Sequence, residues 1–215
     1  MLPRVTDYVR TVENPHGVFR SLGVPEVERN VYGEVELHAG NNSVIFTYLS
    51  GSQKRFLKCY TRHNPHLHTV YSYIERVRPQ LLPRVRLLPA ELYVTTLAGE
   101  ARWVDVVEGE WTEGTTLDRA IARAVKADNR VRLSELAQSF DELCRALLAE
   151  EWAHGDLKPE NIVVGADGTM TLIDCDAVWG YRRWRERGLV SSAHPRTATP
   201  SATRAGLTNT LTTIL

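Results

Sequence analysis

The sequence predicts an α+β protein in which an antiparallel β-sheet comes before a mainly helical part. Three observations predict this class. Strand-type segments rich in Val, Tyr, Phe and Ile fill residues 31–60, a long helical period begins at Leu133, and a polar segment flanked by two short apolar runs follows that period. With 215 residues, the chain can bury one substantial core or two small lobes that share an interface.

The first 30 residues mix a short helical pattern with turn-forming residues. Val5, Tyr8, Val9 and Val12 recur at helical spacing, whereas Pro and Gly interrupt the rest of the segment. We interpret residues 1–30 as an N-terminal extension.

Three strand-type segments follow, with the sequences VYGEVELH, SVIFTYL and KRFLKCY. β-Branched and aromatic residues favour strands, and SGSQ between the second and third segments is a hairpin signal. The segment PHLHTVYSYIERVRPQ places Tyr71, Ile74 and Val77 at helical spacing, and the strand-type pieces AELYV and RWVDVV come after it. Residues 31–110 are therefore expected to form an antiparallel sheet with one helix.

The clearest helical pattern repeats an apolar residue every three or four positions, at Leu133, Leu136, Phe140, Leu143 and Leu147. It leads into HGDLKPENIVVGADGTMTLIDCD, where NIVV and TMTLID flank an Asp-Gly turn at Asp167 and Gly168. For residues 111–186 the sequence predicts a helix, a polar loop and a two-stranded hairpin.

The composition gives no general argument for a polyanionic partner. The 26 basic residues balance the 26 acidic ones, although residues 181–215 contain six Arg and one Glu, a net charge of +5 that leaves −5 on residues 1–180. No apolar run approaches the length of a membrane span, and three widely separated cysteines fit neither a disulfide framework nor a zinc knuckle. We expect a soluble cytoplasmic protein with no nucleic-acid or membrane partner.

The polar loop carries the residue types that phosphoryl transfer needs. Asp156 and Asn161 stand five apart in DLKPEN, and Asp174 follows 13 residues after Asn161 at the end of the second strand. Mg²⁺ prefers carboxylate and amide oxygens together with phosphate oxygens, so Asn161 and Asp174 suit a magnesium site. Asp156 suits the base that accepts a hydroxyl proton, and Lys158 can place positive charge beside the migrating phosphoryl group.

This segment resembles the catalytic loop and metal-binding strand of the protein kinase family, in its serine/threonine form with Lys158 two residues after Asp156. The resemblance implies a two-lobed protein-kinase-like fold that uses ATP and Mg²⁺ to phosphorylate a Ser/Thr hydroxyl of an unidentified protein. FLKCY resembles the third strand of that family, so Lys58 would hold the nucleotide phosphates. Glu75 is the only acidic residue between Lys58 and Glu91, and it lies on the expected helix, which makes it the expected ion-pair partner of Lys58.

The nucleotide-binding loop and the hinge resemble the family less closely. If Val44 is the valine after the glycine-rich loop, LHAGNNS supplies only Gly40, and Asn41 would help to present backbone amides to the phosphates. EWTEG resembles the hinge between the lobes, whose backbone from Glu110 to Thr112 would pair with the adenine edge.

Two departures from the family keep alternatives open. Asp176 stands where the family has glycine, and only 41 residues follow Asp174, which is too few for a complete C-lobe. We expect residues 187–215, rich in Thr and without an apolar period, to be disordered, and a change of reading frame after the Asp-Cys-Asp motif is one hypothesis for the short C-lobe.

A C-lobe truncated in this way would impair catalysis, so a non-catalytic nucleotide-binding scaffold is one alternative function. A small-molecule kinase of the aminoglycoside or choline type, which also uses His-Gly-Asp, is another. A metal site at His63, His66 and His68 is less favoured than solvated or capping histidines, because no Cys or carboxylate stands close to them in the sequence.

Overall fold

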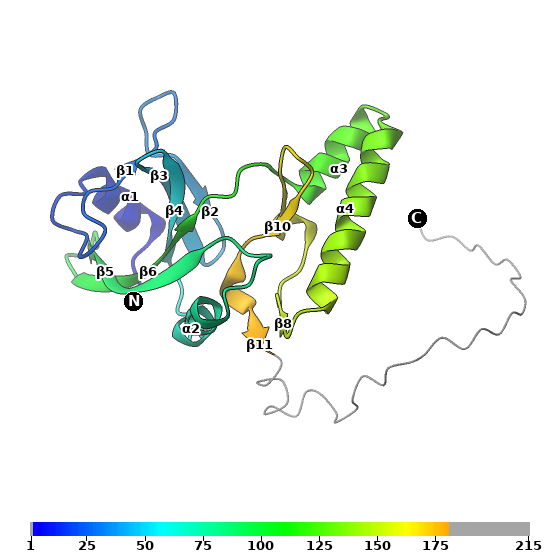
Figure 1. Ribbon diagram of the computed structural model, residues 1–215. Coiled ribbons are helices and arrows are strands. Elements are labelled where there is room, and N and C mark those ends of the chain that lie inside the picture. Colours follow the sequence, from blue (N-terminus) through cyan, green and yellow to red (C-terminus); the bar gives the residue numbers. More distant parts are fainter. Residues whose placement is uncertain (1, 181–215) are drawn as a thin grey trace, which may run out of the picture. The chain divides into compact units, whose positions relative to one another are not determined.

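The computed structural model describes residues 2–180, and the expectations for the C-terminal tail lie outside this range. The described residues belong to one compact unit. Its first half contains α1 (Val5–Glu13), β1 (Glu26–Val27), β2 (Leu37–Ala39), β3 (Ser43–Ser50), β4 (Gln53–Tyr60), α2 (Leu67–Val77), β5 (Val85–Thr95) and β6 (Ala101–Glu110) (Figure 1).

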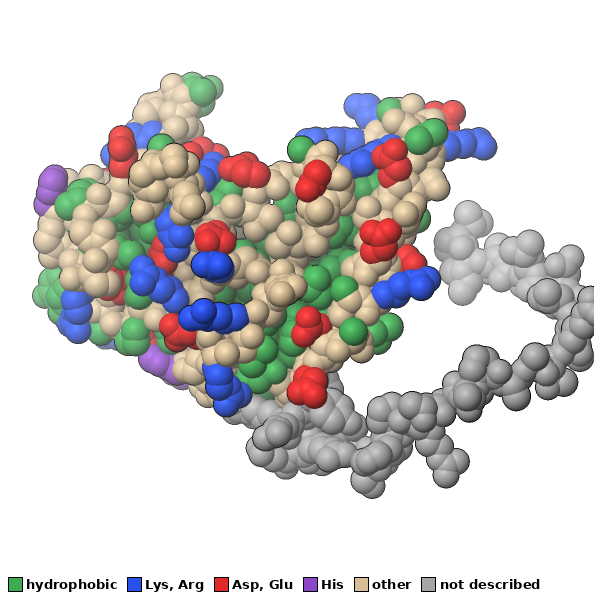
Figure 2. Space-filling view, in the orientation of Figure 1, with side chains coloured by type: hydrophobic (Ala, Val, Ile, Leu, Met, Phe, Trp, Pro, Cys, Tyr) green, Lys and Arg blue, Asp and Glu red, His purple; other side chains and the backbone are tan. Residues whose placement is uncertain are grey.

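The second half of the unit is built from two helices and several short elements. These are β7 (Thr115–Thr116), α3 (Leu117–Lys126), α4 (Arg130–Leu148), β8 (Trp152–Ala153), η1 (Pro159–Asn161), β9 (Ile162–Val164), β10 (Met170–Leu172), η2 (Cys175–Ala177) and β11 (Trp179–Gly180), where η marks a 3-10 helix. None of the described helices combines the length and the hydrophobicity needed to cross a membrane. Acidic and basic side chains are interspersed on the face drawn in Figure 2.

The predicted antiparallel sheet is confirmed. Its strands lie in the order β1-β3-β4-β6-β5, and β2 also pairs with β3. In the hairpin that SGSQ predicts, Ser50 pairs with Gln53, and Gly51 takes a φ of 62°. Tight hairpin turns need positive φ, which glycine adopts without a steric penalty.

The two faces of the sheet belong to different hydrophobic clusters. Phe46 and Leu57 are cross-strand partners and pack in one cluster with Tyr8 of α1. Lys58 and Val107, which pair across β4 and β6, lie on the opposite face, where Val107 joins the second cluster. Because side chains alternate along a strand, Lys58 points away from α1 and toward the elements that follow the sheet.

The first 30 residues are packed into the sheet rather than set apart from it. Tyr8 is fully buried, and its hydroxyl donates to the carbonyl of Tyr60 at 2.8 Å. The carboxylate of Asp7 accepts from the backbone N–H of Leu97 at 2.8 Å, and β1 pairs with β3. The helical spacing predicted α1 correctly, and its apolar side is part of the first cluster.

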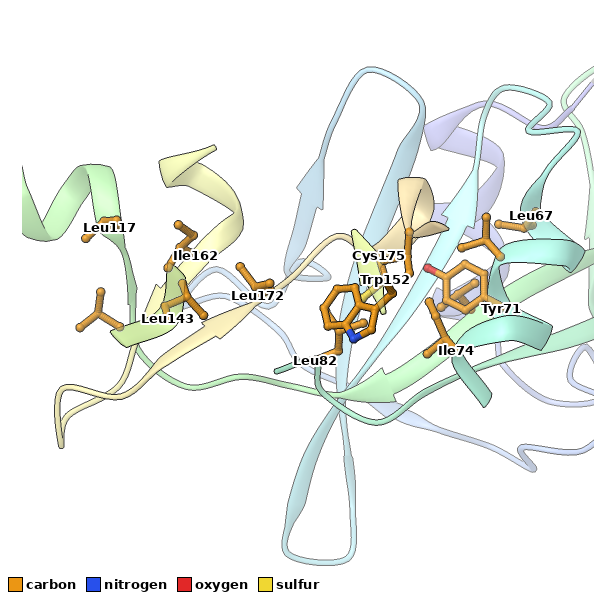
Figure 3. Close-up of a cluster of buried hydrophobic side chains, with 14 of the residues drawn as sticks. Leu67, Tyr71, Ile74, Leu82, Leu117, Leu143, Trp152, Ile162, Leu172 and Cys175 are labelled. Carbon is orange, nitrogen blue, oxygen red and sulfur yellow. The ribbon is translucent and has the colours of Figure 1, made fainter. Parts of the chain in front are cut away.

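The second cluster joins the sheet to the elements that follow it. Figure 3 shows part of this cluster, to which α2, α3, α4, β8, β9, β10 and η2 contribute Leu67, Tyr71, Ile74, Leu117, Leu143, Trp152, Ile162, Leu172 and Cys175. Burying one large aliphatic or aromatic side chain contributes about 1.5–3 kcal/mol. The cluster therefore holds the segments on both sides of the β9–β10 hairpin against the sheet.

The three cysteines provide a direct test of this packing. Cys59 and Cys175 are buried, and burial raises the pKa of the Cys175 thiol to about 12, whereas Cys144 on α4 is partly exposed. In native protein we expect a thiol reagent to modify Cys144 rapidly and the other two only after unfolding, because the thiolate is the reactive form. Titration with a chromogenic disulfide reagent, with and without denaturant, measures this. Rapid reaction of two or more thiols in native protein would contradict the packing.

Candidate functional site

The polar loop between β8 and β9, residues 154–161 and named here the Asp156 loop, forms its own hydrogen-bond network. Asp156 Oδ2 accepts from Lys158 Nζ at 2.8 Å and from Asn161 Nδ2 at 3.0 Å. Asn161 Nδ2 also donates to the backbone carbonyl of Asp156 at 2.9 Å. These contacts bring together the three loop residues that the sequence singled out.

The network keeps the Asp156 carboxyl ionised. The hydrogen bond from Lys158 is the main cause that holds the pKa of Asp156 below its ordinary value, and Asn161 adds to it. The same contact raises the pKa of Lys158. Both side chains are nearly half exposed, so the pair remains accessible to a substrate.

His154 and Gly155, the first two residues of the Asp156 loop, contact the segment after β10. His154 is 1% exposed, and its Nε2 lies 2.8 Å from the carbonyl oxygen of Ile173. A carbonyl oxygen can only accept, so Nε2 carries the proton, and Nδ1 is buried without a partner within residues 2–180. Gly155 takes a φ of +79°, and a Cβ there would lie 2.1 Å from the carbonyl oxygen of Ala177.

Lys58 meets two carboxylates from a distant part of the chain. Its Nζ lies 2.6 Å from Asp174 Oδ1 and 2.8 Å from Asp176 Oδ2. The Lys58 side chain is only 7% exposed. Burial by itself lowers the pKa of Lys58, but the attraction of Asp176 and Asp174 outweighs burial and raises that pKa overall. The ammonium therefore stays charged.

Asp174 takes a backbone conformation that is uncommon for a residue other than glycine. Its φ of 61° and ψ of 67° lie in the left-handed region, which non-glycine residues seldom adopt, although Asp tolerates it better than most. This turn at the end of β10 directs the chain into η2, where Asp176 follows. Strained residues of this kind often occur at functional sites.

Two tyrosines complete the group around Lys58. The hydroxyls of Tyr60 on β4 and Tyr71 on α2 donate to Asp176 Oδ1 at 2.7 and 2.8 Å. Burial is the main cause that raises the pKa of both hydroxyls, so they remain neutral donors. The sequence reasoning missed both tyrosines, although strand alternation does put Tyr60 on the same face as Lys58.

Glu75 does not join this group. It is exposed on α2, and within residues 2–180 it forms no ion pair, whereas Lys58 pairs with Asp174 and Asp176. The expected Lys58–Glu75 pair is corrected accordingly. The reason is that α2 presents Tyr71 to the cluster, and the carboxylates that surround Lys58 come from the segment after β10.

The expected nucleotide-binding loop is a short turn between β2 and β3, and Val44 does not face Lys58. Gly40 and Asn41 are exposed in that turn, which is closed by a hydrogen bond from the Gly40 N–H to the Ser43 carbonyl at 2.9 Å. Val44 is fully buried in the cluster with α1, on the opposite face of the sheet. Ile45, the cross-strand partner of Lys58, is the residue on the Lys58 face.

The expected hinge begins at Glu110, the last residue of β6. The backbone N–H of Glu110 donates to the Arg84 carbonyl at 2.9 Å, and that of Trp111 donates to the Lys54 carbonyl at 3.1 Å. Thr112 is the residue of this stretch whose N–H has no hydrogen bond within the described chain. A base edge could therefore use the Thr112 N–H as a donor, but not the Glu110 N–H.

The oxygens available for a metal are few. Within residues 2–180, no three His, Cys, Asp or Glu side chains gather as a metal site, and His68 pairs with Asp105 while His66 packs against Trp179. Asn161 uses its amide nitrogen for Asp156, which leaves its carbonyl oxygen free to coordinate. One amide oxygen together with Asp174 fits Mg²⁺, which takes few protein ligands and shares phosphate oxygens.

An apolar groove of about 420 Å³ borders the Asp156 loop. It is lined by Leu117, Ile121, Leu133, Leu136, Ala137, Phe140, Leu157, Lys158, Pro159 and Ile162. Of the candidate site residues only Lys158 lines it, so the groove is distinct from the Lys58 group.

Part of the chain resembles a known protein family. Residues 108–183 match the sequence model of APH, a phosphotransferase enzyme family. This range contains the Asp156 loop, Asp174 and Asp176, whereas Lys58 lies outside it. No curated protein matches the chain. The matched range is thus similar to a phosphotransferase family of the protein-kinase-like superfamily.

Proposed function

We propose that the protein transfers the γ-phosphoryl group of ATP to a hydroxyl group, with Mg²⁺ bound at Asn161 and Asp174, in a protein-kinase-like fold of two lobes. The observation that carries the proposal is the contact between Lys58 Nζ and Asp174 Oδ1 at 2.6 Å, which joins residues 116 positions apart. A nucleotide that binds together with a metal ion needs a cation for its phosphates and a carboxylate for the metal. The buried ammonium of Lys58 and the adjacent carboxylate of Asp174 would supply these two groups.

Each residue has a defined role in this proposal. Lys58 holds the phosphates, and bound magnesium neutralises charge on the phosphate oxygens. Asp156 accepts the proton of the acceptor hydroxyl while the hydroxyl oxygen bonds to the γ-phosphorus and the bond to ADP breaks. Lys158, which contacts Asp156 at 2.8 Å, stabilises the negative charge of the transferred group.

The nucleotide would lie on the Lys58 face of the sheet. Ile45, the partner of Lys58 on β3, is partly exposed there and offers apolar contact to a base. The free N–H of Thr112 and the amides of the Gly40 turn supply the polar contacts. Val44 and Glu75 have no part in this arrangement.

The first candidate acceptor is a Ser or Thr hydroxyl of a protein, because the Asp156 loop carries Lys158 in the form DLKPEN. The second is a small-molecule hydroxyl, favoured by Gly155 within His-Gly-Asp and by the match to the phosphotransferase model. Incubating the full chain with γ-labelled ATP, generic protein acceptors and a panel of aminoglycosides and choline separates the two. ATP binding without transfer to any acceptor would favour the scaffold alternative.

Nucleotide binding has a measurable signature in stability. At about 100 times its dissociation constant, ATP with Mg²⁺ should stabilise the wild type by about 2.7 kcal/mol in thermal or urea unfolding. Asp174→Ala should lose most of this stabilisation, because it removes the carboxylate assigned to the metal. Asp167→Ala, in the β9–β10 turn, is the matched control and should keep it. Absence of any stabilisation of the wild type would refute the proposed function.

A further inference from the structure

The two carboxylates that contact Lys58 are held very differently. Asp174 is 40% exposed at its side chain, and within residues 2–180 its carboxylate has Lys58 as its only hydrogen-bond donor. Asp176 is 25% exposed and receives three donors, from Lys58, Tyr60 and Tyr71. Asp176 is thus fixed by its surroundings, and Asp174 is free to take another partner.

The difference between Asp174 and Asp176 matters because Lys58 is buried. An ammonium whose side chain is 7% exposed requires a nearby negative charge, since an unpaired buried charge is strongly unfavourable. If Asp174 turns to a metal ion, Asp176 is the carboxylate that continues to neutralise Lys58. The two oxygens of Asp176 have different partners: Oδ2 accepts from Lys58, and Oδ1 accepts from the two tyrosines.

We propose that Asp176 is the positioning residue for Lys58, anchored by Tyr60 and Tyr71, in the role for which the sequence led us to expect Glu75. Tyr71 makes the connection to α2, so a shift of that helix is transmitted to Lys58 through the Asp176 carboxylate. The importance of this position for nucleotide binding rests on the proposed function, but the coupling of Lys58 to Asp176 does not.

The first measurement uses no nucleotide. Thermal unfolding of the full chain is compared for wild type, Lys58→Met, Asp176→Asn and the double variant. Asn keeps the size of Asp176 and can still accept hydrogen bonds from the tyrosines. Any loss of stability therefore reports the removal of the negative charge. We expect Asp176→Asn to lower Tm by several degrees, and by much less when Lys58 is already Met. Additive losses would overturn the positioning role, whether or not the protein binds ATP.

The second measurement uses ATP with Mg²⁺ as ligand. Asp176→Asn should weaken binding about tenfold, which is about 1.4 kcal/mol. Tyr71→Phe, which keeps the charge and removes one anchor, should weaken binding less. In the Lys58→Met background Asp176→Asn should cause no further loss, and the Mg²⁺ dependence should not change.

A loss that persists with Lys58→Met and grows at low Mg²⁺ would make Asp176 a metal ligand and overturn the positioning role. A wild type that does not bind ATP would refute the proposed function alone, because the unfolding cycle would still decide the coupling.

Discussion

Replacing Asp156 with Asn should lower phosphoryl transfer by about 10²–10⁴-fold, the usual contribution of a positioned base, while ATP binding stays close to that of the wild type. Asn is nearly isosteric and can still accept the hydrogen bonds that Lys158 and Asn161 donate to Asp156. It cannot accept the proton of the acceptor hydroxyl. The loss should therefore appear in the rate of transfer and leave the ATP-induced stabilisation unchanged.

The pH dependence of transfer tests the same assignment. The pKa of Asp156 is lowered in the folded protein, chiefly by Lys158, so the carboxylate persists as the pH falls toward the ordinary range of an Asp side chain. Loss of base catalysis should therefore occur at a lower pH than for an Asp side chain with its ordinary pKa. Asp167→Asn, in the hairpin turn, is the control and should leave the rate unchanged. If Asp156→Asn abolished ATP binding, the residue would belong to the metal site instead.

Much of the fold could be predicted because its signals are local. The β-branched and aromatic residues of SVIFTYL and KRFLKCY predicted β3 and β4, the period from Leu133 predicted α4, and the Asp-Gly pair predicted the β9–β10 hairpin. The helix α3 was missed, although apolar residues recur at helical spacing in LDRAIARAVK; two of the three residues it buries are alanines, which are a weak hydrophobic signal. The helical spacing near the N-terminus predicted α1 but not that it packs on the sheet.

The arrangement around Lys58 could be predicted only in part. The spacing of the Asp156 loop was informative because its contacts span two to five residues. The partners of Lys58 come from more than 100 residues away, and no local pattern reveals them. Val44 and Ile45 are neighbours in β3, so their side chains lie on opposite faces, and only Ile45 lies on the Lys58 face.

Gly155→Ala should produce a large loss of stability, about 2–5 kcal/mol, and with it most of the phosphoryl transfer. The φ of +79° is unfavourable for alanine by about 1–2 kcal/mol. The added Cβ would also lie 2.1 Å from the Ala177 carbonyl oxygen, and overpacking of this kind typically costs a further 1–3 kcal/mol. Neither residue can move away easily, because the neighbouring residues Ala153 and Trp179 are paired as strands.

Gly168→Ala is the matched control for this substitution. Gly168 has a similar φ of +85°, but nothing lies within 4 Å of the position its Cβ would occupy. It should therefore lose only the backbone contribution of about 1–2 kcal/mol in urea unfolding. The difference between the two variants measures the contact between the Asp156 loop and Ala177. Equal losses would mean that the contact relaxes easily, and that glycine is needed at position 155 for its φ alone.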